Sequence, residues 1–181
     1  MKDKEIIIGI CGSIAAYKAP ELVRMLRSHG ARITCILTGN GARFVTPLTL
    51  QTVSCNKVYE GMFDPLVWDI EHISLAQKAD IVVVAPASAD AIARFASGRA
   101  EDLLSSVILS TEKPVLICPA MNDRMWLHPA TQENVRRLTG YGYHFAQPEK
   151  GELACGATGV GRLADLAAIT RAVSEIIAGS R

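Results

Sequence analysis

The stretch EIIIGICGS, from Glu5 to Ser13, decides the fold. Its first seven residues form a short, almost uninterrupted apolar run rich in β-branched side chains, which is typical of a strand buried on both faces of a parallel sheet. Gly12 and Ser13 end this run, and Ser13 is suited to cap a helix that continues to about His29. The stretch therefore predicts the first strand, turn and helix of an α/β protein.

Strand and helix patterns alternate along the rest of the chain. Apolar runs at 31–37, 80–85, 114–118 and 142–146 predict four further strands, and helical patterns separate them. Right-handed crossovers then give a doubly wound parallel sheet with helices on both faces, a three-layer α/β architecture. We expect residues 1–181 to form a single domain, because 181 residues suffice for a full core and no linker-like segment divides them.

Composition narrows the class of protein. Hydrophobic residues make up 49% of the chain and charged residues 20%, as in a compact protein, and a net charge of +1 gives no reason to expect nucleic acid or a membrane surface as partner. The N-terminal apolar run is broken by Gly9 and Gly12, so it fits neither a signal peptide nor a spanning helix, and we expect a cytoplasmic protein.

The five cysteines include no C-x-x-C pair, which argues against a disulfide framework and a zinc site. Cys11, Cys35 and Cys118 fall in strand patterns and are expected in the core. Cys155 differs, because it lies in the glycine-rich segment 147–162, which predicts a flexible and accessible flap.

Three predicted strands end in small or polar residues at the start of a helix, namely at 12–13, 86–90 and 119–122. The carboxyl ends of parallel strands share one edge of the sheet, where ligands bind, and helix N-termini suit a phosphate. The first turn matches neither G-x-G-x-x-G nor a P-loop, and the second strand ends at Thr38 rather than at an acid. A mononucleotide is therefore favoured, although Ser13 and Thr38 can also serve only as caps and turn formers.

Two further features allow more than one interpretation. His72, in the first turn of a predicted helix, is either structural or an acid/base group.

The irregular segment 56–70 carries aromatic and Met side chains that either pack under the loop or form a lid or partner surface. Glu101 and Asp102 are expected to be the solvated start of another helix.

Five motifs give the chain a family resemblance: GSIAAYK at 12–18, HISLA at 72–76, APASAD at 85–90, PAMNDRMW at 119–126 and ACGATGVGR at 154–162. Together they resemble the phosphopantothenoylcysteine decarboxylases, within the wider family of flavin-containing cysteine decarboxylases, over essentially the whole chain. The resemblance implies a flavodoxin-like, Rossmann-type sheet and FMN as cofactor. It also implies a homo-oligomer, either a trimer or trimers assembled into a dodecamer, with the site between subunits, and a phosphopantothenoylcysteine synthetase as a fused or separate partner.

The same resemblance implies a reaction and roles for particular residues. In this family FMN oxidises the thiol of 4'-phosphopantothenoylcysteine, carbon dioxide leaves, and the resulting enethiolate is reduced to 4'-phosphopantetheine. His72 would act as acid/base, Asn122 would hold the substrate carboxylate, and Cys155 would supply the proton for the reduction. The positions that would meet FMN are Gly12, Ser13 and Thr38 at the phosphate and ribityl chain, and Ser88, Ala89, Asp90 and Met121 nearer the flavin.

Three other activities share this resemblance. Peptidyl-cysteine decarboxylases of lantibiotic pathways stop at the enethiol and should not need Cys155. Flavin prenyltransferases bind FMN similarly, but the octet at 119–126 argues against them. A non-catalytic FMN-binding regulatory subunit would bind flavin without turnover, and the joint presence of His72, Asn122 and Cys155 argues against it.

Overall fold

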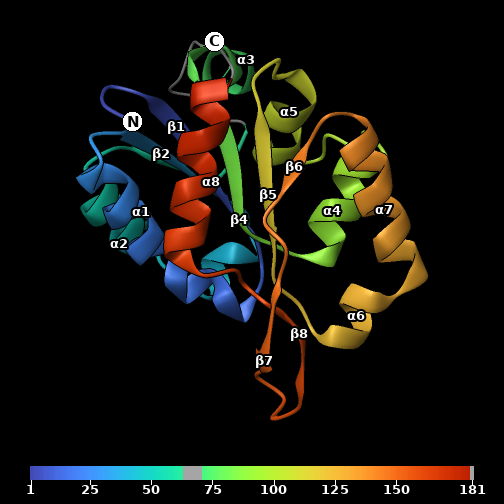
Figure 1. The fold of residues 1–181 in the computed structure, drawn as a ribbon. Helices are drawn as coiled ribbons and strands as arrows, with labels where there is room; N and C mark the ends of the chain where they lie inside the picture. The colour runs from blue at the N-terminus through green and yellow to red at the C-terminus, as the bar shows by residue number, and fades with distance from the viewer. Residues whose placement is uncertain (63–70, 180–181) are drawn as a thin grey trace.

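A computed structural model describes residues 1–62 and 71–179, and these residues form a three-layer α/β structure (Figure 1). The central sheet has six parallel strands in the order β3-β2-β1-β4-β5-β6. The strands are β1 (Glu5–Ile10), β2 (Arg32–Leu37), β3 (Val58–Tyr59), β4 (Ile81–Ala87), β5 (Val115–Pro119) and β6 (His144–Phe145). This confirms the doubly wound, flavodoxin-like Rossmann-type sheet that the sequence predicts.

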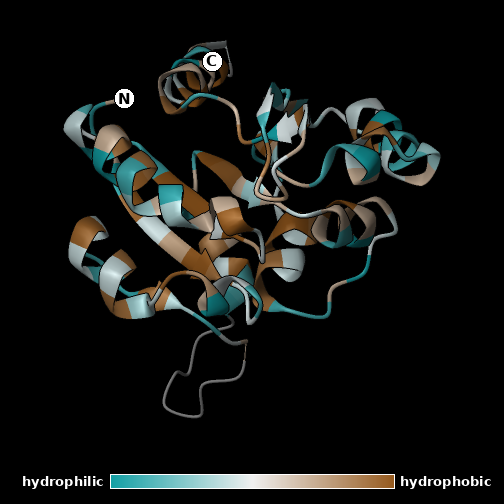
Figure 2. Ribbon diagram, turned by 90° about the horizontal axis from the view of Figure 1, so that it is seen from below, coloured by the Kyte–Doolittle hydropathy of each residue, from teal (hydrophilic) through white to brown (hydrophobic). Residues whose placement is uncertain are grey.

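Helices cover both faces of the sheet, and side chains alternate between the two faces along each strand. Helices α1 (Ala19–Ser28), α2 (Pro47–Ser54) and α8 (Leu166–Gly179) pack in a first core, which receives Ile6, Ile8 and Ile10 of β1. Helices α3 (Glu71–Lys78), α4 (Ala89–Ala96), α5 (Leu103–Ser110) and α7 (Pro129–Gly140) pack in a second core, which receives Ile7. Figure 2 shows the hydrophobic strands enclosed between these two layers. Burial on both faces explains why β1 reads as a continuous apolar run.

The strand order reverses between β1 and β4. Strand β1 pairs with β2 on one side and with β4 on the other, so the chain winds outward in both directions from this point. The helices that follow β1 and β4 leave on opposite faces, and their N-termini flank a crevice at the carboxyl edge. The edge at which the sequence predicts a ligand is therefore also the edge at which the strand order reverses.

Two local differences from the sequence prediction have physical causes. The first helix is divided into a 3-10 turn, Ile14–Lys18, and α1, because Pro20 lacks an N–H and its ring disfavours a continuous helix through the preceding turn. Strand β3, within the segment predicted to be irregular, adds a sixth strand beside β2. Residues 63–70, which include the Phe63, Pro65 and Trp68 of the predicted lid or partner surface, lie outside the described part of the chain.

The glycine-rich segment, predicted from the sequence to be a flexible flap, contains a β-hairpin. Strands β7 (Glu149–Glu152) and β8 (Thr158–Arg162) pair antiparallel, and the loop between them is closed by a hydrogen bond from the Leu153 N–H to the Ala157 carbonyl at 2.8 Å. The hairpin projects from the lower end of the molecule in Figure 1, below the carboxyl end of β5. Within the described residues, no helix has the length and apolar character needed to cross a membrane.

The strand cysteines are buried, as the sequence predicts. Cys11, Cys35 and Cys118 are at most 1% exposed. Burial raises the pKa of Cys11 and of Cys35 to about 12, and it raises the pKa of Cys118 as well, so all three thiols stay protonated at neutral pH. Cys155 is exposed in the hairpin loop.

Candidate functional site

A cavity of about 680 Å³ opens at the carboxyl edge of the sheet, between the turn after β1, the start of α4, the turn after β5 and the β7–β8 hairpin. Sixteen of its eighteen wall residues belong to the motifs singled out in the sequence, and the other two, Glu152 and Leu153, directly precede the last motif. Seven of the predicted site residues line it: Gly12, Ser13, Ser88, Ala89, Met121, Asn122 and Cys155. Segments that are up to about 140 residues apart in the chain thus meet at one edge of a parallel sheet, as expected.

The turn after β1 is fixed against two neighbouring loops. The Ser13 hydroxyl donates to the Ala120 carbonyl at 3.0 Å and accepts from the Ala15 N–H at 3.4 Å, so it both caps the 3-10 turn and ties β1 to the end of β5. A Cβ at Gly12 would lie 2.5 Å from the Asn40 Cβ, so only glycine lets the two loops approach this closely. The turn is therefore rigid where it borders the cavity.

Asn122 and Cys155 form the chemically distinctive pair of the cavity. Asn122 precedes α6 (Asp123–Leu127), and its side-chain oxygen caps that helix by accepting from the Arg124 N–H at 3.0 Å. With the oxygen occupied, the amide nitrogen is directed to the Cys155 sulfur at 3.6 Å. The cap thus fixes which end of the amide is available, and the site presents N–H donors beside a thiol.

Two glycines of β8 hold the hairpin that carries Cys155 against the turn after β5. The Met121 N–H donates to the Gly161 carbonyl at 3.0 Å, and a Cβ at Gly161 would overlap the Met121 carbonyl oxygen. A Cβ at Gly159 would lie 2.6 Å from the Asp123 Cβ. These contacts need bare backbone, so the glycines that suggested flexibility in the sequence serve close packing instead.

At the start of α4, the polar residues cap the helix and form ion pairs. The Ser88 hydroxyl accepts from the Ala91 N–H at 3.2 Å. Asp90 does not line the cavity; its carboxylate lies 3.1 Å from the Arg94 Nε. The same Arg94 pairs with Asp102 at 2.6 Å. Asp90 was predicted to lie near the flavin, but within one copy of the chain its side chain does not line the cavity.

Asp102 starts a helix and Glu101 is exposed, as the sequence predicts, but Asp102 is less solvated than expected. Asp102 caps α5 in a capping box with Ser105, accepting from the Ser105 N–H at 2.8 Å, and it is only partly exposed. Burial alone would raise the pKa of its carboxyl, but the hydrogen bonds from Ser105 and Arg94 outweigh burial and hold the pKa below its usual value. Asp102 and Arg94 together fix α5 against α4.

His72 and Thr38 lie outside the cavity. Thr38 is buried, and its hydroxyl donates to the Ile10 carbonyl and accepts from the Gly41 N–H, both at 3.1 Å, so it joins the ends of β1 and β2. His72 lies in the first turn of α3, which packs on α5. Figure 1 places α3 and the β7–β8 hairpin at opposite ends of the molecule. One copy of the chain therefore does not bring His72 to Asn122 and Cys155.

Several wall residues were not proposed as site residues from the sequence. Tyr17 and Met125 line the cavity and are 63% and 50% exposed, and the charged residues Lys18, Glu152 and Arg162 line it as well. Four of the five fall inside the quoted motifs at 12–18, 119–126 and 154–162, and membership of these motifs could have identified them as site residues. Glu152 precedes the last motif, and only the hairpin brings it to the cavity.

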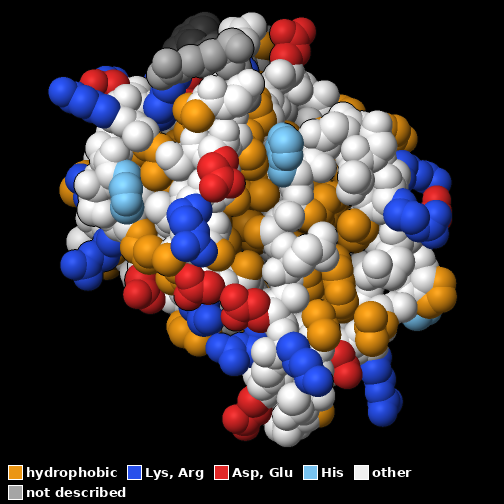
Figure 3. Space-filling view, viewed as in Figure 1, with side chains coloured by type: hydrophobic (Ala, Val, Ile, Leu, Met, Phe, Trp, Pro, Cys, Tyr) orange, Lys and Arg blue, Asp and Glu red, His pale blue; other side chains and the backbone are white. Residues whose placement is uncertain are grey.

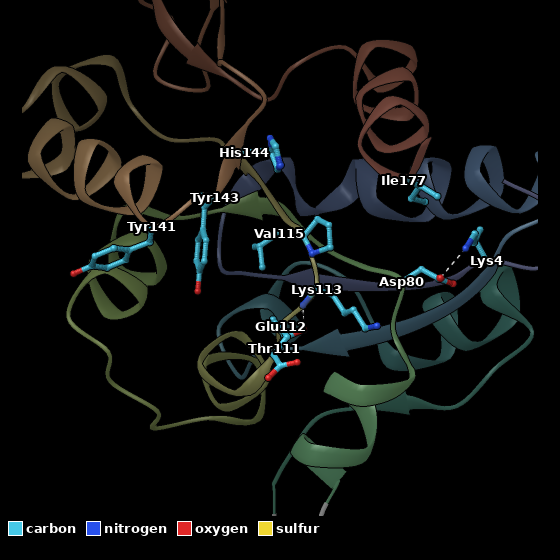
Figure 4. A pocket seen from close by; sticks show the side chains of 12 residues that line it. Lys4, Asp80, Thr111, Glu112, Lys113, Val115, Tyr141, Tyr143, His144 and Ile177 are labelled. Atoms are coloured by element: carbon cyan, nitrogen blue, oxygen red, sulfur yellow. Dashed lines mark hydrogen bonds and ion pairs between the residues drawn. The ribbon is translucent and has the colours of Figure 1, made fainter. Parts of the chain in front are cut away.

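A second hollow, also of about 680 Å³, lies at the opposite edge of the sheet, near the amino ends of β4, β5 and β6 (Figure 4). Lys4 and Asp80 are joined by an ion pair of 2.8 Å at its side, and Tyr143 turns its hydroxyl to the Ile108 carbonyl at 3.2 Å. None of the residues predicted to act on a ligand lines this hollow. We therefore assign the candidate site to the cavity at the carboxyl edge.

The cavity suits a planar aromatic cofactor with a single phosphate. Ile14, Ala89, Met121, Met125 and Leu153 give it an apolar wall. The start of the 3-10 turn at Ile14 and the start of α4 at Ala89 face the same space, and the first N–H groups of helical segments lack partners within the helix. The residues present therefore fit both the ring system and the phosphate of a mononucleotide.

Comparison with known proteins places the chain among flavin proteins. The model of the family described as Flavoprotein matches residues 1–178. The coenzyme A biosynthesis bifunctional protein CoaBC of Haemophilus influenzae is 44% identical over 176 residues, which cover 97% of this chain and 44% of that protein. The chain thus spans less than half the length of this curated relative.

Two solved structures share nearly the whole fold. A PPC decarboxylase mutant complexed with pantothenoylaminoethenethiol is similar with a TM-score of 0.86 and 27% identity, covering 96% of this chain and 98% of the other. The FMN-dependent cysteine decarboxylase SpaF is similar with a TM-score of 0.83 and 29% identity, covering 96% of this chain and 97% of the other.

Proposed function

Because the chain belongs to the Flavoprotein family, we propose that it binds FMN and decarboxylates 4'-phosphopantothenoylcysteine to 4'-phosphopantetheine in coenzyme A biosynthesis. One observation carries this proposal: an amide and a thiol, Asn122 and Cys155, lie 3.6 Å apart in a cavity with an apolar wall and helix N-termini. A carboxylate beside a saturated carbon has no electron sink, so its loss requires that one be created, which oxidation of the neighbouring thiol carbon would do. When bound, FMN would supply a reversible two-electron oxidation of the substrate thiol.

The cofactor would be held by the three loops at the carboxyl edge. The turn after β1, formed by Gly12 and Ser13, would bind the phosphate. Ser88, Ala89 and Met121 line the wall where the flavin ring would lie. Thr38 and Asp90 do not line the cavity, so they would support the cofactor site only indirectly, by fixing the loops that border it.

Asn122 would orient the substrate carboxylate. Its oxygen is engaged by the Arg124 N–H, so only amide N–H groups face the substrate. A neutral donor binds a carboxylate less strongly than an arginine would, because charge-assisted hydrogen bonds are roughly twice as strong as neutral ones. The carboxylate is thus positioned without being stabilised so much that loss of carbon dioxide becomes harder.

Cys155 would give the proton of its Sγ to the substrate when the enethiolate is reduced. The thiol is exposed in the hairpin loop and lies beside the Asn122 amide, so it is next to the atoms that the amide holds. The three strand thiols are buried away from the cavity and cannot replace it. A peptidyl-cysteine decarboxylase that stops at the enethiol would have no use for this proton.

His72 would reach the site from a second copy of the chain. It lies away from the cavity, and its proposed task, to take and return the proton of the substrate thiol, requires contact with the substrate. The proposal therefore includes a homo-oligomer, a trimer or trimers assembled into a dodecamer, in which His72 of one copy faces Asn122 and Cys155 of another. Large exposed apolar side chains beside the cavity, Ile14 at 56% and Tyr17 at 63%, favour such contact.

Two further parts of the proposal concern the surroundings of the enzyme. A phosphopantothenoylcysteine synthetase would supply the substrate, either fused to this chain or separate, in keeping with a relative described as bifunctional. The reaction would take place in the cytoplasm, where five free cysteines would remain reduced.

The decisive assay is to incubate FMN-loaded protein with 4'-phosphopantothenoylcysteine and to follow carbon dioxide and 4'-phosphopantetheine by mass. A folded, yellow protein that makes no product would sink the decarboxylase proposal and leave a flavin-binding regulatory subunit. Cys155→Ser should accumulate a decarboxylated product two hydrogens lighter than 4'-phosphopantetheine. If this variant makes the normal product at the normal rate, Cys155 is not the proton donor.

Mixing two variants, neither of which should form 4'-phosphopantetheine, tests the shared site. His72→Asn and Cys155→Ser each remove one group, and in a randomly mixed oligomer about a quarter of the sites would combine an intact His72 with an intact Cys155 from a neighbouring copy. We expect co-expression to restore about that fraction of wild-type turnover. If both groups act within one copy, the mixture stays as inactive as its components.

A further inference from the structure

We propose that Lys18 and Arg162 form a subsite for a phosphate monoester, the 4'-phosphate of the substrate. This inference rests on the proposed function. Both residues line the same cavity as Asn122 and Cys155, Lys18 from the end of the 3-10 turn and Arg162 from the end of β8. They are the two cationic residues of its wall, against a single carboxylate, Glu152.

The hairpin has a built-in space for the Arg162 side chain. A Cβ at Gly151 of β7 would lie 2.5 Å from the Arg162 Nη1 and 2.7 Å from its Cδ, so the guanidinium group crosses β7 where that strand has no side chain. Any larger residue at 151 would push the guanidinium away. Gly151 therefore leaves room for the Arg162 side chain to lie across the hairpin.

Neither cation has a partner among the described residues. Lys18 and Arg162 form no ion pair and no side-chain hydrogen bond within residues 1–62 and 71–179, and Glu152 pairs with neither of them. Arg94, in contrast, pairs with two carboxylates. Figure 3 shows basic side chains interspersed with acidic ones at the lower end of the molecule, around the hairpin. A guanidinium and an ammonium group in the wall of one cavity suit a dianionic phosphate, because arginine binds two phosphate oxygens at once.

Geometry favours the phosphate of the substrate over that of the cofactor. The cofactor phosphate has the turn at Gly12 and Ser13, with the N–H groups at the start of the 3-10 turn. Arg162 instead shares the hairpin with Cys155, where the cysteinyl end of the substrate would be held. The Arg162 guanidinium lies over Gly151, which pairs with Gly159 of β8, so it is set back along the hairpin from the loop that carries Cys155.

Binding of the product and of its dephosphorylated analogue tests the subsite without turnover. Calorimetry would measure 4'-phosphopantetheine and pantetheine on the FMN-loaded wild type, Lys18→Gln, Arg162→Gln and Gly151→Ala. Loss of a charge-assisted phosphate contact should weaken 4'-phosphopantetheine about 10–100-fold in Arg162→Gln, while pantetheine changes by less than about twofold. Gly151→Ala should show the same selective loss although it removes no charge. Lys150→Gln, on the same hairpin but outside the cavity, is the matched control and should leave both affinities unchanged.

Three results would overturn the subsite. The first is an equal loss of affinity for both ligands in Arg162→Gln. The second is a loss of bound FMN instead, which would make the pair a cofactor site. The third is a wild type that binds the phosphorylated ligand no more tightly than pantetheine. The proposed reaction fails differently. A wild type that prefers 4'-phosphopantetheine but releases no carbon dioxide from 4'-phosphopantothenoylcysteine supports the subsite and refutes the decarboxylase.

Discussion

Gly161→Ala should separate the placement of the hairpin from the stability of the fold. Gly161 of β8 meets the turn after β5 backbone to backbone, and an added Cβ would overlap the Met121 carbonyl oxygen. Ordinary contacts begin at 3.4 Å. The strand must therefore retreat by on the order of 1 Å, which would break the hydrogen bond from the Met121 N–H to the Gly161 carbonyl.

The cost of this retreat follows from two contributions. Overpacking against a fixed backbone costs about 1–3 kcal/mol, and loss of one hydrogen bond costs about 1 kcal/mol, so the docked hairpin is disfavoured by about 2–4 kcal/mol. Cys155 then moves relative to Asn122, which lies 3.6 Å away in the docked state. Since a misplacement of about 1 Å can lower a rate about 10²-fold, we expect kcat to fall by about that factor.

Three measurements check this reasoning: kcat for carbon dioxide release, the melting temperature, and limited trypsin digestion after Lys150 and Arg162, which flank the hairpin loop. The two hydrophobic cores lie on the faces of the sheet, so the melting temperature should fall by only a few degrees, whereas cleavage in the hairpin should accelerate. Gly140→Ala is the control, because a Cβ there meets nothing within 4 Å. Wild-type kcat in Gly161→Ala, or the same slow cleavage in both variants, would refute a role for the close glycine contact.

Other predictions use the same structure. Asn122→Asp keeps a good helix cap but replaces the amide donors with a charge that repels the substrate carboxylate, so kcat/KM should fall by about 10²-fold or more with little change in melting temperature; a variant that retains turnover would exclude the amide as the carboxylate site. Native protein should take two labels from an alkylating reagent, at Cys55 and Cys155, and five after unfolding, as counted by mass; a third native label would contradict the burial of the strand thiols. Asp102→Asn keeps the cap but loses the charge opposite Arg94, which should cost about 1–2 kcal/mol in the free energy of unfolding at pH 7. Because the folded pKa of Asp102 is lowered, its contribution is complete above about pH 4 and is lost as the pH falls through that lowered pKa, so urea titrations should show the gap between variant and wild type shrinking toward pH 3.

The fold could be predicted from the sequence because its decisive elements are local patterns. A strand buried on both faces leaves a run such as that at 5–11, and alternation with helices then fixes the parallel sheet and its active edge. Strand β3 left no such signal: it has two residues, both only half-buried, and pairs only along the edge of β2. Short edge strands depend on their neighbour rather than on their own sequence.

The site was predictable in part, and two of the missed wall residues share one cause. Gly12, Ser13, Asn122 and Cys155 were found because each lies where a strand or hairpin ends, which the sequence marks with glycine, proline or a cap. Arg162 and Glu152 were missed as wall residues because their position depends on the pairing of β7 with β8. The glycine-rich segment did not reveal the hairpin, since sequence alone does not distinguish a glycine needed for flexibility from one needed for close contact.

The positions of the hairpin and of His72 bear on how the proposed site is completed. The cavity holds a thiol, an amide and two cations on elements of one copy of the chain, but the proposed acid/base group, His72, does not line it and belongs to α3, which lies at the opposite end of Figure 1 from the hairpin. Groups that must act on one substrate can be this far apart only if oligomerisation brings them together. Association would then complete the site as well as bury the exposed Ile14 and Tyr17, so dissociation should abolish turnover while each subunit keeps its phosphate-binding wall. Activity that falls with dilution, with unchanged preference for 4'-phosphopantetheine over pantetheine, is the expected result; activity proportional to protein concentration in a demonstrated monomer would contradict it.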